Sequence, residues 1–171
     1  MAGKTFLRQV TGRLTEIFGT QTSAGAGNAG DIVALDSSGK LDTTVFPTGI
    51  GAETASIVAG ENLSAGDFIY VYDATGTPKV KKADATDPTK FAMGFVLGAF
   101  TSGNPATVYF TGINNQVSGM TDGVRQYLSI TTPGGIQNAA PTGSGNIVQP
   151  LGVAISATEL PSVLGEPITL A

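Results

Sequence analysis

The feature that most constrains this chain is a series of short apolar segments separated by turn signals, which begins at residue 54. Residues 68–72 read FIYVY, a β-branched and aromatic segment typical of a strand. Residues 91–100 form a longer apolar run, in which Gly94 and Gly98 favour a bent, buried strand over a helix. About eight or nine such segments follow one another, a pattern typical of a β-sandwich or β-barrel. We therefore predict an all-β fold, with a small sandwich or barrel domain over residues 54–171.

The N-terminal segment has a different pattern. Over residues 4–18, apolar side chains recur at helical spacing with charged and polar residues between them. Gly19 fits a C-terminal cap, although Gly12 lowers the helix propensity. A helix of about 15 residues is marginal by itself and needs a surface to pack on. We therefore predict an amphipathic helix in residues 1–19, with its apolar stripe buried on a partner.

Residues 20–53 combine a flexible linker with an apolar arm. Residues 20–30 read TQTSAGAGNAG, and small polar residues of this kind are typical of a linker. Residues 31–53 are rich in apolar side chains but too short for a core of their own. We expect this arm to run extended across a neighbouring subunit, where it adds a strand to an exposed sheet edge. The predicted protein interface comprises Phe6, Leu7, Val10, Leu14, Ile17, Phe18, Ile32, Val33, Leu35, Leu41, Phe46, Pro47 and Ile50.

The composition argues against catalysis and against a bound cofactor. The chain has no cysteine and no histidine, which removes thiolate nucleophiles, Ser-His-Asp triads and the most common metal ligands. Acid–base chemistry would then need paired carboxylates, whereas the acidic residues here lie in or near turn signals. We predict that the protein is not an enzyme and that it holds no cofactor and no metal.

Two local patterns look like ligand-binding motifs but are better explained as linker and turns. Gly25, Gly27 and Gly30 match G-x-G-x-x-G, yet a linker precedes them and a predicted strand follows, the reverse of the dinucleotide-binding context. The Asp-rich turns at residues 36–42 and 67–73 supply two carboxylates each, fewer than a calcium loop needs. We expect these carboxylates to accept backbone N–H bonds within their turns.

The charge pattern excludes two further classes of partner. The net charge is −4 and the basic residues form no patch, so we predict no nucleic-acid partner. No apolar run reaches about 18 residues, so we expect neither a transmembrane helix nor a membrane partner. Lys4, Arg8 and Arg13 interrupt the apolar residues of the N-terminus, unlike in a signal peptide, and we expect synthesis and assembly in a cytoplasm.

Two stretches resemble virion proteins of tailed bacteriophages. Residues 30–42, GDIVALDSSGKLD, closing with residues 46–51, FPTGIG, resemble a connector in such proteins. Residues 65–71, AGDFIYV, begin a stretch that resembles a small β domain of capsid decoration proteins, head fibres and some tail fibres. The similarity continues through residues 94–98, 118–121, 127–129, 134–136, 145–149 and 151–154. Residues 4–18 lie outside it.

The resemblance implies a homotrimer on the capsid exterior that stabilises the shell by bridging major capsid subunits. The implied location is the virion, reached after assembly in the host cytoplasm, and no catalytic residues are implied. An alternative is a tail fibre or baseplate component whose β domain contacts the host surface. A third is a carbohydrate-binding or lytic module, which would need a carboxylate pair or an aromatic platform. Tyr70 and Tyr72, on one strand face, are the candidates for such a platform.

Overall fold

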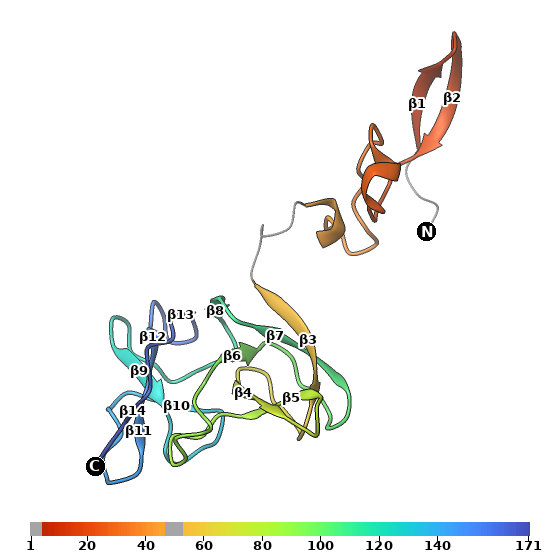
Figure 1. The fold of residues 1–171 in the computed structure, drawn as a ribbon. Helices are drawn as coiled ribbons and strands as arrows, with labels where there is room; N and C mark the ends of the chain where they lie inside the picture. Colours follow the sequence, from red (N-terminus) through yellow and green to blue (C-terminus); the bar gives the residue numbers. More distant parts are fainter. Residues whose placement is uncertain (1–4, 47–52) are drawn as a thin grey trace. The chain divides into compact units, whose positions relative to one another are not determined.

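The computed structural model describes residues 5–46 and 53–171 (Figure 1). The chain forms two units, Met1–Gly51 and Ala52–Ala171, called here the N-terminal unit and the C-terminal unit. Both are built from strands and turns, and no α-helix is present over the described ranges. The prediction of an all-β fold is confirmed, whereas the predicted N-terminal helix is wrong.

The elements are short throughout. The N-terminal unit contains β1 (Thr5–Val10), β2 (Arg13–Phe18) and the 3₁₀ turns η1 (Gly25–Asn28) and η2 (Thr43–Val45). The C-terminal unit contains β3 (Thr54–Ala59), β4 (Phe68–Asp73), β5 (Pro78–Lys82), β6 (Gly94–Val96), β7 (Pro105–Tyr109), β8 (Gly112–Asn114), β9 (Arg125–Leu128), β10 (Ile136–Gln137), β11 (Ile147–Val148), β12 (Pro150–Val153), β13 (Leu160–Ser162) and β14 (Ile168–Thr169).

The segment predicted as a helix, residues 4–18, contains a β-hairpin instead. β1 and β2 pair antiparallel, and the ladder closes at Val10↔Arg13 around a two-residue loop. The loop residues Thr11 and Gly12 both have positive φ, 50° and 81°, as a type I′ hairpin turn requires. The Thr-Gly turn and the β-branched residues around it therefore outweigh the helical spacing of the apolar side chains.

Residues 19–46 fold into turns rather than regular strands. Thr20 and Val33 form an isolated parallel bridge, and the N–H of Ala34 donates to the Thr20 carbonyl oxygen at 2.9 Å. A second turn spans residues 36–40. In it the N–H of Asp36 donates to the Lys40 carbonyl oxygen at 2.8 Å, and the N–H of Gly39 donates to the Asp36 carbonyl oxygen at 3.1 Å. Local hydrogen bonds thus hold the segment that was expected to form a linker and an extended arm.

Five strands of the C-terminal unit close a barrel in the order β3-β5-β4-β6-β7 (Figure 1). β3 runs parallel to β5 and antiparallel to β7, and the remaining pairs are antiparallel. Successive strand residues point to opposite faces, so alternate side chains fill the barrel interior. This interior core contains Ala59, Leu63, Ile69, Val80, Val96, Ala106 and Val108.

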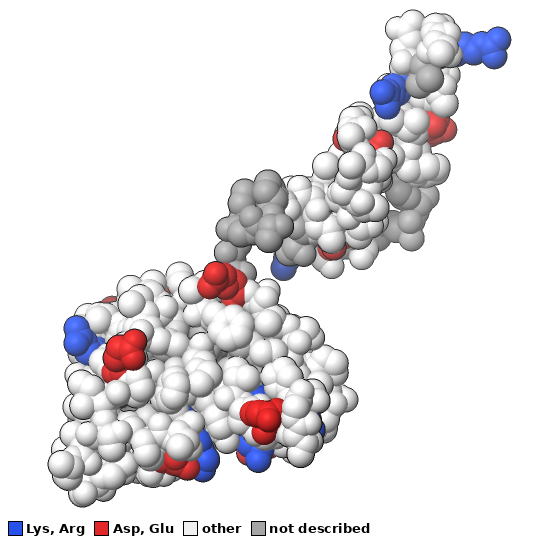
Figure 2. Space-filling view, in the orientation of Figure 1, with Lys and Arg blue, Asp and Glu red and all other residues white. Residues whose placement is uncertain are grey.

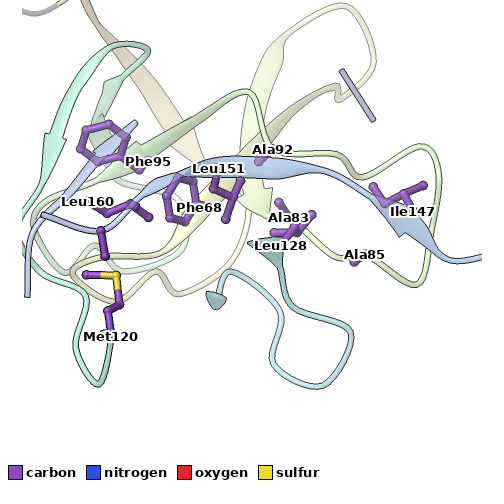
Figure 3. Packing of buried hydrophobic residues seen from close by; sticks show 11 residues of the cluster. Phe68, Ala83, Ala85, Ala92, Phe95, Met120, Leu128, Ile147, Leu151 and Leu160 are labelled. Carbon is purple, nitrogen blue, oxygen red and sulfur yellow. The ribbon is translucent and has the colours of Figure 1, made fainter. Parts of the chain in front are cut away.

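The later strands cover an outer wall of the barrel and create a second core. Phe68, Phe95 and Tyr109 lie side by side on that wall, with ring centroids 6.0 Å and 5.6 Å apart. Apolar side chains from β9, β11, β12 and β13 pack against them, namely Leu128, Ile147, Leu151 and Leu160. Figure 3 shows this core as an elongated row of side chains with Phe68 and Leu151 near its centre.

A buried glutamine links the two layers. Gln149, between β11 and β12, is 1% exposed. Its Oε1 accepts the Ala92 N–H at 2.7 Å, and its Nε2 donates to the carbonyl oxygens of Ala92 at 2.8 Å and Gly165 at 3.2 Å. The side chain thus satisfies both backbone groups of Ala92, as a neighbouring strand would.

Candidate interaction surfaces

The described part of the N-terminal unit, residues 5–46, shows no core of its own. Over residues 5–46, no side chain that the structure describes is buried. This range carries eight of the thirteen exposed large apolar side chains found among the described residues. An isolated two-stranded hairpin is at best marginally stable in water. The apolar side chains of this unit are therefore exposed to any partner that can bury them.

One face of the hairpin carries three highly exposed apolar side chains. Directly paired residues share a face, and successive pairs alternate between the two faces. By this register Leu7, Leu14 and Phe18 share one face, and they are 73%, 73% and 71% exposed. The Thr5 hydroxyl donates to the Glu16 carboxylate on the same face. Each of the three apolar side chains is paired directly with a polar residue, namely Glu16, Gln9 and Thr5, so the apolar groups of this face lie diagonally to one another.

The opposite face of the hairpin packs on its own unit. Phe6 and Ile17 are directly paired on this face, and both are half-buried. A Cβ added at Gly19 would lie 3.0 Å from the Phe6 ring and 2.5 Å from the Ala34 Cβ, so the close packing here requires glycine. The side chains that were predicted to form one helical stripe are thus divided between the two faces of the hairpin.

The apolar residues of the arm are also exposed. Five of those predicted to bind a partner have exposed fractions between 43% and 56%, namely Ile32, Val33, Leu35, Leu41 and Phe46. Pro47, Ile50 and the side chain of Val10 were predicted too, and they lie outside the described residues.

Aspartates fix the turns of the arm. The Asp31 carboxylate accepts hydrogen bonds from the side chains of Asn28 and Thr20, both at 2.9 Å, and these bonds lower the pKa of Asp31. Asp42 accepts from the hydroxyl of Thr44 at 2.6 Å and from its N–H at 2.9 Å, and its pKa is lowered for the same reason. These carboxylates therefore act within the turns, as expected from the sequence.

The C-terminal unit has an apolar surface that sequence analysis missed. β12 and β13 direct Leu151 and Leu160 into the second core, while side chains near them are exposed and line a groove of about 560 Å³. Ile113 of β8 is paired directly with Pro161 of β13 and extends this surface. We call Ile113, Val153, Ile155, Pro161 and Val163 the outer-face patch.

A sequence signal for this patch exists in residues 150–155, which read PLGVAI without a polar residue. A strand with one solvated face alternates between apolar and polar residues, whereas a strand covered on both faces reads as a continuous apolar run. The run therefore indicates a second apolar face on β12.

A second cleft, of about 190 Å³, is polar. It is lined by Glu61, Tyr70, Lys81, Lys82, Asp84, Lys90 and Pro133. Lys82 and Lys90 each form an ion pair with an aspartate, at 3.1 Å and 3.0 Å, and Lys81 Nζ lies 5.1 Å from the centre of the Tyr72 ring. Two of the three lysines are therefore paired with a carboxylate, and Lys81, beside the Tyr72 ring, is the one lysine of the cleft without an ion pair over the described residues.

The loop of residues 84–90 beside this cleft repeats one turn. Asp87 Oδ1 accepts the hydroxyl of Thr89 at 2.7 Å and its N–H at 2.9 Å, and Asp84 binds Thr86 in the same way. The hydrogen bonds from Thr89, together with Lys90, lower the pKa of Asp87 to about 2. Asp84 and Asp87 therefore stabilise the turns of this loop by accepting hydrogen bonds within it.

Charged side chains are sparse on the surface. Figure 2 shows isolated basic and acidic groups on a face that is otherwise uncharged. Among the residues that the structure describes, no three His, Cys, Asp or Glu side chains gather where they could hold a metal ion. Nor does the described part of the chain contain a helix with the length and hydropathy to cross a membrane. The two apolar surfaces are thus the prominent features.

No family model, no curated protein and no solved structure matches this chain.

Proposed function

We propose that this chain is a bacteriophage virion structural protein that decorates the capsid exterior and stabilises the shell by bridging neighbouring major capsid subunits. Its partners are the major capsid protein and further copies of itself in a homotrimer. It binds without catalysis, cofactor, nucleic acid or membrane, and it joins the virion in the host cytoplasm. The resemblance of residues 30–160 supports this assignment.

The observation that carries the proposal is the uneven distribution of apolar surface. The C-terminal unit buries two clusters of apolar side chains and needs no further segment to complete them. The N-terminal unit exposes eight large apolar side chains over its described residues and buries none. A segment with this composition gains stability when a partner covers it, because burial removes apolar area from water.

A bridging role follows from the two-unit organisation. When two binding elements are linked, the second binds at a high effective concentration once the first is bound. A folded unit joined to an apolar attachment unit can therefore contact two neighbouring shell subunits with higher avidity than either contact alone. The sparse charge is consistent with attachment by apolar contact and strand addition rather than by electrostatic attraction.

The test is attachment of a double variant, Leu35→Ser with Phe46→Ser, to particles that lack the protein. Both side chains are about half exposed, so neither change removes a core contact within the chain. If the shell buries the exposed half of each side chain, they contribute roughly 1.5–3 kcal/mol together, and occupancy at a limiting concentration falls about tenfold or more. The matched control is Ser37→Ala with Ser38→Ala, which changes exposed residues of the same arm and should bind fully.

The readout is the number of copies per purified particle, measured by quantitative gel or mass spectrometry. Hundreds of wild-type copies support decoration, whereas a few copies located at the tail would place the protein in a fibre or baseplate. Full occupancy and unchanged heat resistance with the double variant would show that the arm is only a tether.

A further inference from the structure

The exposed apolar side chains of the C-terminal unit are concentrated on one face. Over residues 53–171, five large apolar side chains are exposed, and four of them belong to the outer-face patch. Their exposed fractions are 47% for Ile113, 42% for Val153, 54% for Ile155 and 73% for Val163. Scattered exposed apolar residues are ordinary, but a contiguous group with a groove marks an interaction site.

The patch is supported by a rigid part of the fold. Figure 1 shows β9, β12 and β13 close together, and β12 pairs with β9 while contacting β13. The N–H of Val163 donates to the Leu151 carbonyl oxygen at 3.0 Å, and the N–H of Gly165 donates to the Pro150 oxygen at 2.8 Å. The side chain of Leu151 is fully buried behind this backbone. The patch is thus preorganised for binding, unlike the N-terminal unit.

The charges around the patch point to the occupant. Arg125, paired directly with Val153, is the one charged residue that lines the groove, and it takes part in neither ion pair of the described residues. Glu166 follows the groove residue Gly165 in the chain and is exposed. Its carboxylate accepts no side-chain hydrogen bond from any residue that the structure describes. One surface therefore carries an unpaired cation and an unpaired anion beside an apolar groove.

We infer that the outer-face patch is the surface through which copies of this chain associate, with the patches of all copies turned toward a common rotation axis. In a ring, each copy presents Arg125 to its neighbour on one side and Glu166 to its neighbour on the other, so one patch supplies both partners. This inference rests on the self-association included in the proposed function, and it assigns that contact to the C-terminal unit.

The N-terminal arm of a second copy fits the groove less well. Its carboxylates Asp31, Asp36 and Asp42 accept hydrogen bonds within their own turns and would have to leave them to meet Arg125. On the hairpin, Glu16 is already bound by the Thr5 hydroxyl. Glu166 needs no such rearrangement.

The test measures the association of the full chain by sedimentation at micromolar concentration. Val163→Glu places a charge at the most exposed patch residue and should weaken association about tenfold or more, because it buries an unpaired charge between apolar surfaces. The matched control is Ile168→Glu, which changes an apolar residue that is 63% exposed but outside the patch. It should associate like the wild type. Thermal unfolding of each variant checks that the C-terminal unit remains folded.

A charge exchange tests whether Arg125 of one copy lies against Glu166 of its neighbour. Arg125→Glu should weaken association because it places two acids together, and adding Glu166→Arg to the same chain should restore it. Restoration would indicate that the two charges meet between copies, because they form no ion pair with each other within one copy over the described residues. Unrestored association would show that Arg125 and Glu166 do not face each other across the contact.

Three results would overturn the inference. One is a wild-type chain that stays monomeric, another is equal association of the Val163→Glu and Ile168→Glu variants, and the third is association lost only when Leu7 and Leu14 are replaced by serine. Particle binding is scored separately in all cases. If the chain forms a patch-dependent oligomer but does not bind particles, decoration is refuted and this inference stands. If the chain is a monomer but binds particles, this inference is refuted and decoration stands.

Discussion

Replacing Gln149 by leucine tests how the two layers of the C-terminal unit are joined. Leucine has a similar size but offers no hydrogen bond, so it removes the links from Gln149 to Ala92 and Gly165. Ala92 is 2% exposed, and its N–H and carbonyl oxygen would be left buried without their partner.

The expected loss of stability follows from those two groups. A buried backbone group without a partner costs about 1–3 kcal/mol, so the pair costs roughly 2–6 kcal/mol. The Gly165 oxygen loses a longer bond and is only half-buried, so it adds little. The leucine side chain offsets about 1–2 kcal/mol through apolar burial. We expect a net loss of about 3 kcal/mol, which lowers the unfolding temperature by roughly 10 °C in a unit of this size.

The assay is thermal unfolding of the full chain, followed by circular dichroism or calorimetry. Gln116→Leu is the control, because Gln116 is exposed and the one hydrogen bond of its side chain over the described residues is to the neighbouring Asn115. It should change the free energy of unfolding by no more than about 0.5 kcal/mol. If Gln149→Leu were as stable as the wild type, the backbone groups of Ala92 would have other partners or water, and the reasoning above would fail.

Two further outcomes are expected. Deleting residues 1–51 should leave the unfolding temperature of the C-terminal unit unchanged, because both buried clusters consist of residues from that unit. A large decrease in the unfolding temperature would show that these cores depend on the N-terminal unit. Because the folded pKa of Asp87 is lowered from 3.8 to about 2, the stabilisation by this carboxylate is fully present above pH 3.8 and is lost as the pH falls toward 2. Thr89→Ala should move the Asp87 midpoint in a carboxyl NMR titration upward toward 3.8, and an unmoved midpoint contradicts the assigned cause.

The strands of the C-terminal unit could be predicted because their turn residues are specific. Residues 73–76 read Asp-Ala-Thr-Gly, and an Asp followed three residues later by a Gly is typical of a turn. In the structure Thr75 and Gly76 have positive φ of 54° and 85°, and Asp73 Oδ1 accepts the Gly76 N–H at 2.7 Å. Local chemistry of this kind needs no knowledge of the rest of the fold.

The N-terminal hairpin was missed although its turn has the same two residues. Thr11-Gly12 repeats the Thr-Gly pair at 75–76, but the apolar residues around it fit helical spacing as well as strand alternation. Neighbouring apolar residues such as Phe6 and Leu7 fit one broad helical stripe, but on a strand they point to opposite faces. Over so short a segment the spacing alone does not decide between the two periods. The turn chemistry was the stronger signal.

Barrel closure could not be derived from the sequence. It depends on the parallel pairing of β3 with β5, in which Val58 lies opposite Lys79. No loop length or turn residue encodes a contact between segments so far apart in the chain. The sequence pattern therefore left sandwich and barrel open, and tertiary packing decides between them.

The two apolar surfaces differ in what binding requires of them. The outer-face patch lies on strands fixed by a buried core, so covering it orders little that is not already ordered. The described N-terminal unit has no buried side chain, so part of the free energy gained by covering it must offset the ordering of its own residues. If both proposals hold, copies associate through the C-terminal patch before they attach to the shell, because that contact has the smaller ordering cost. The assembled oligomer then presents several N-terminal units at once, and their combined avidity compensates for the weak attachment of each one.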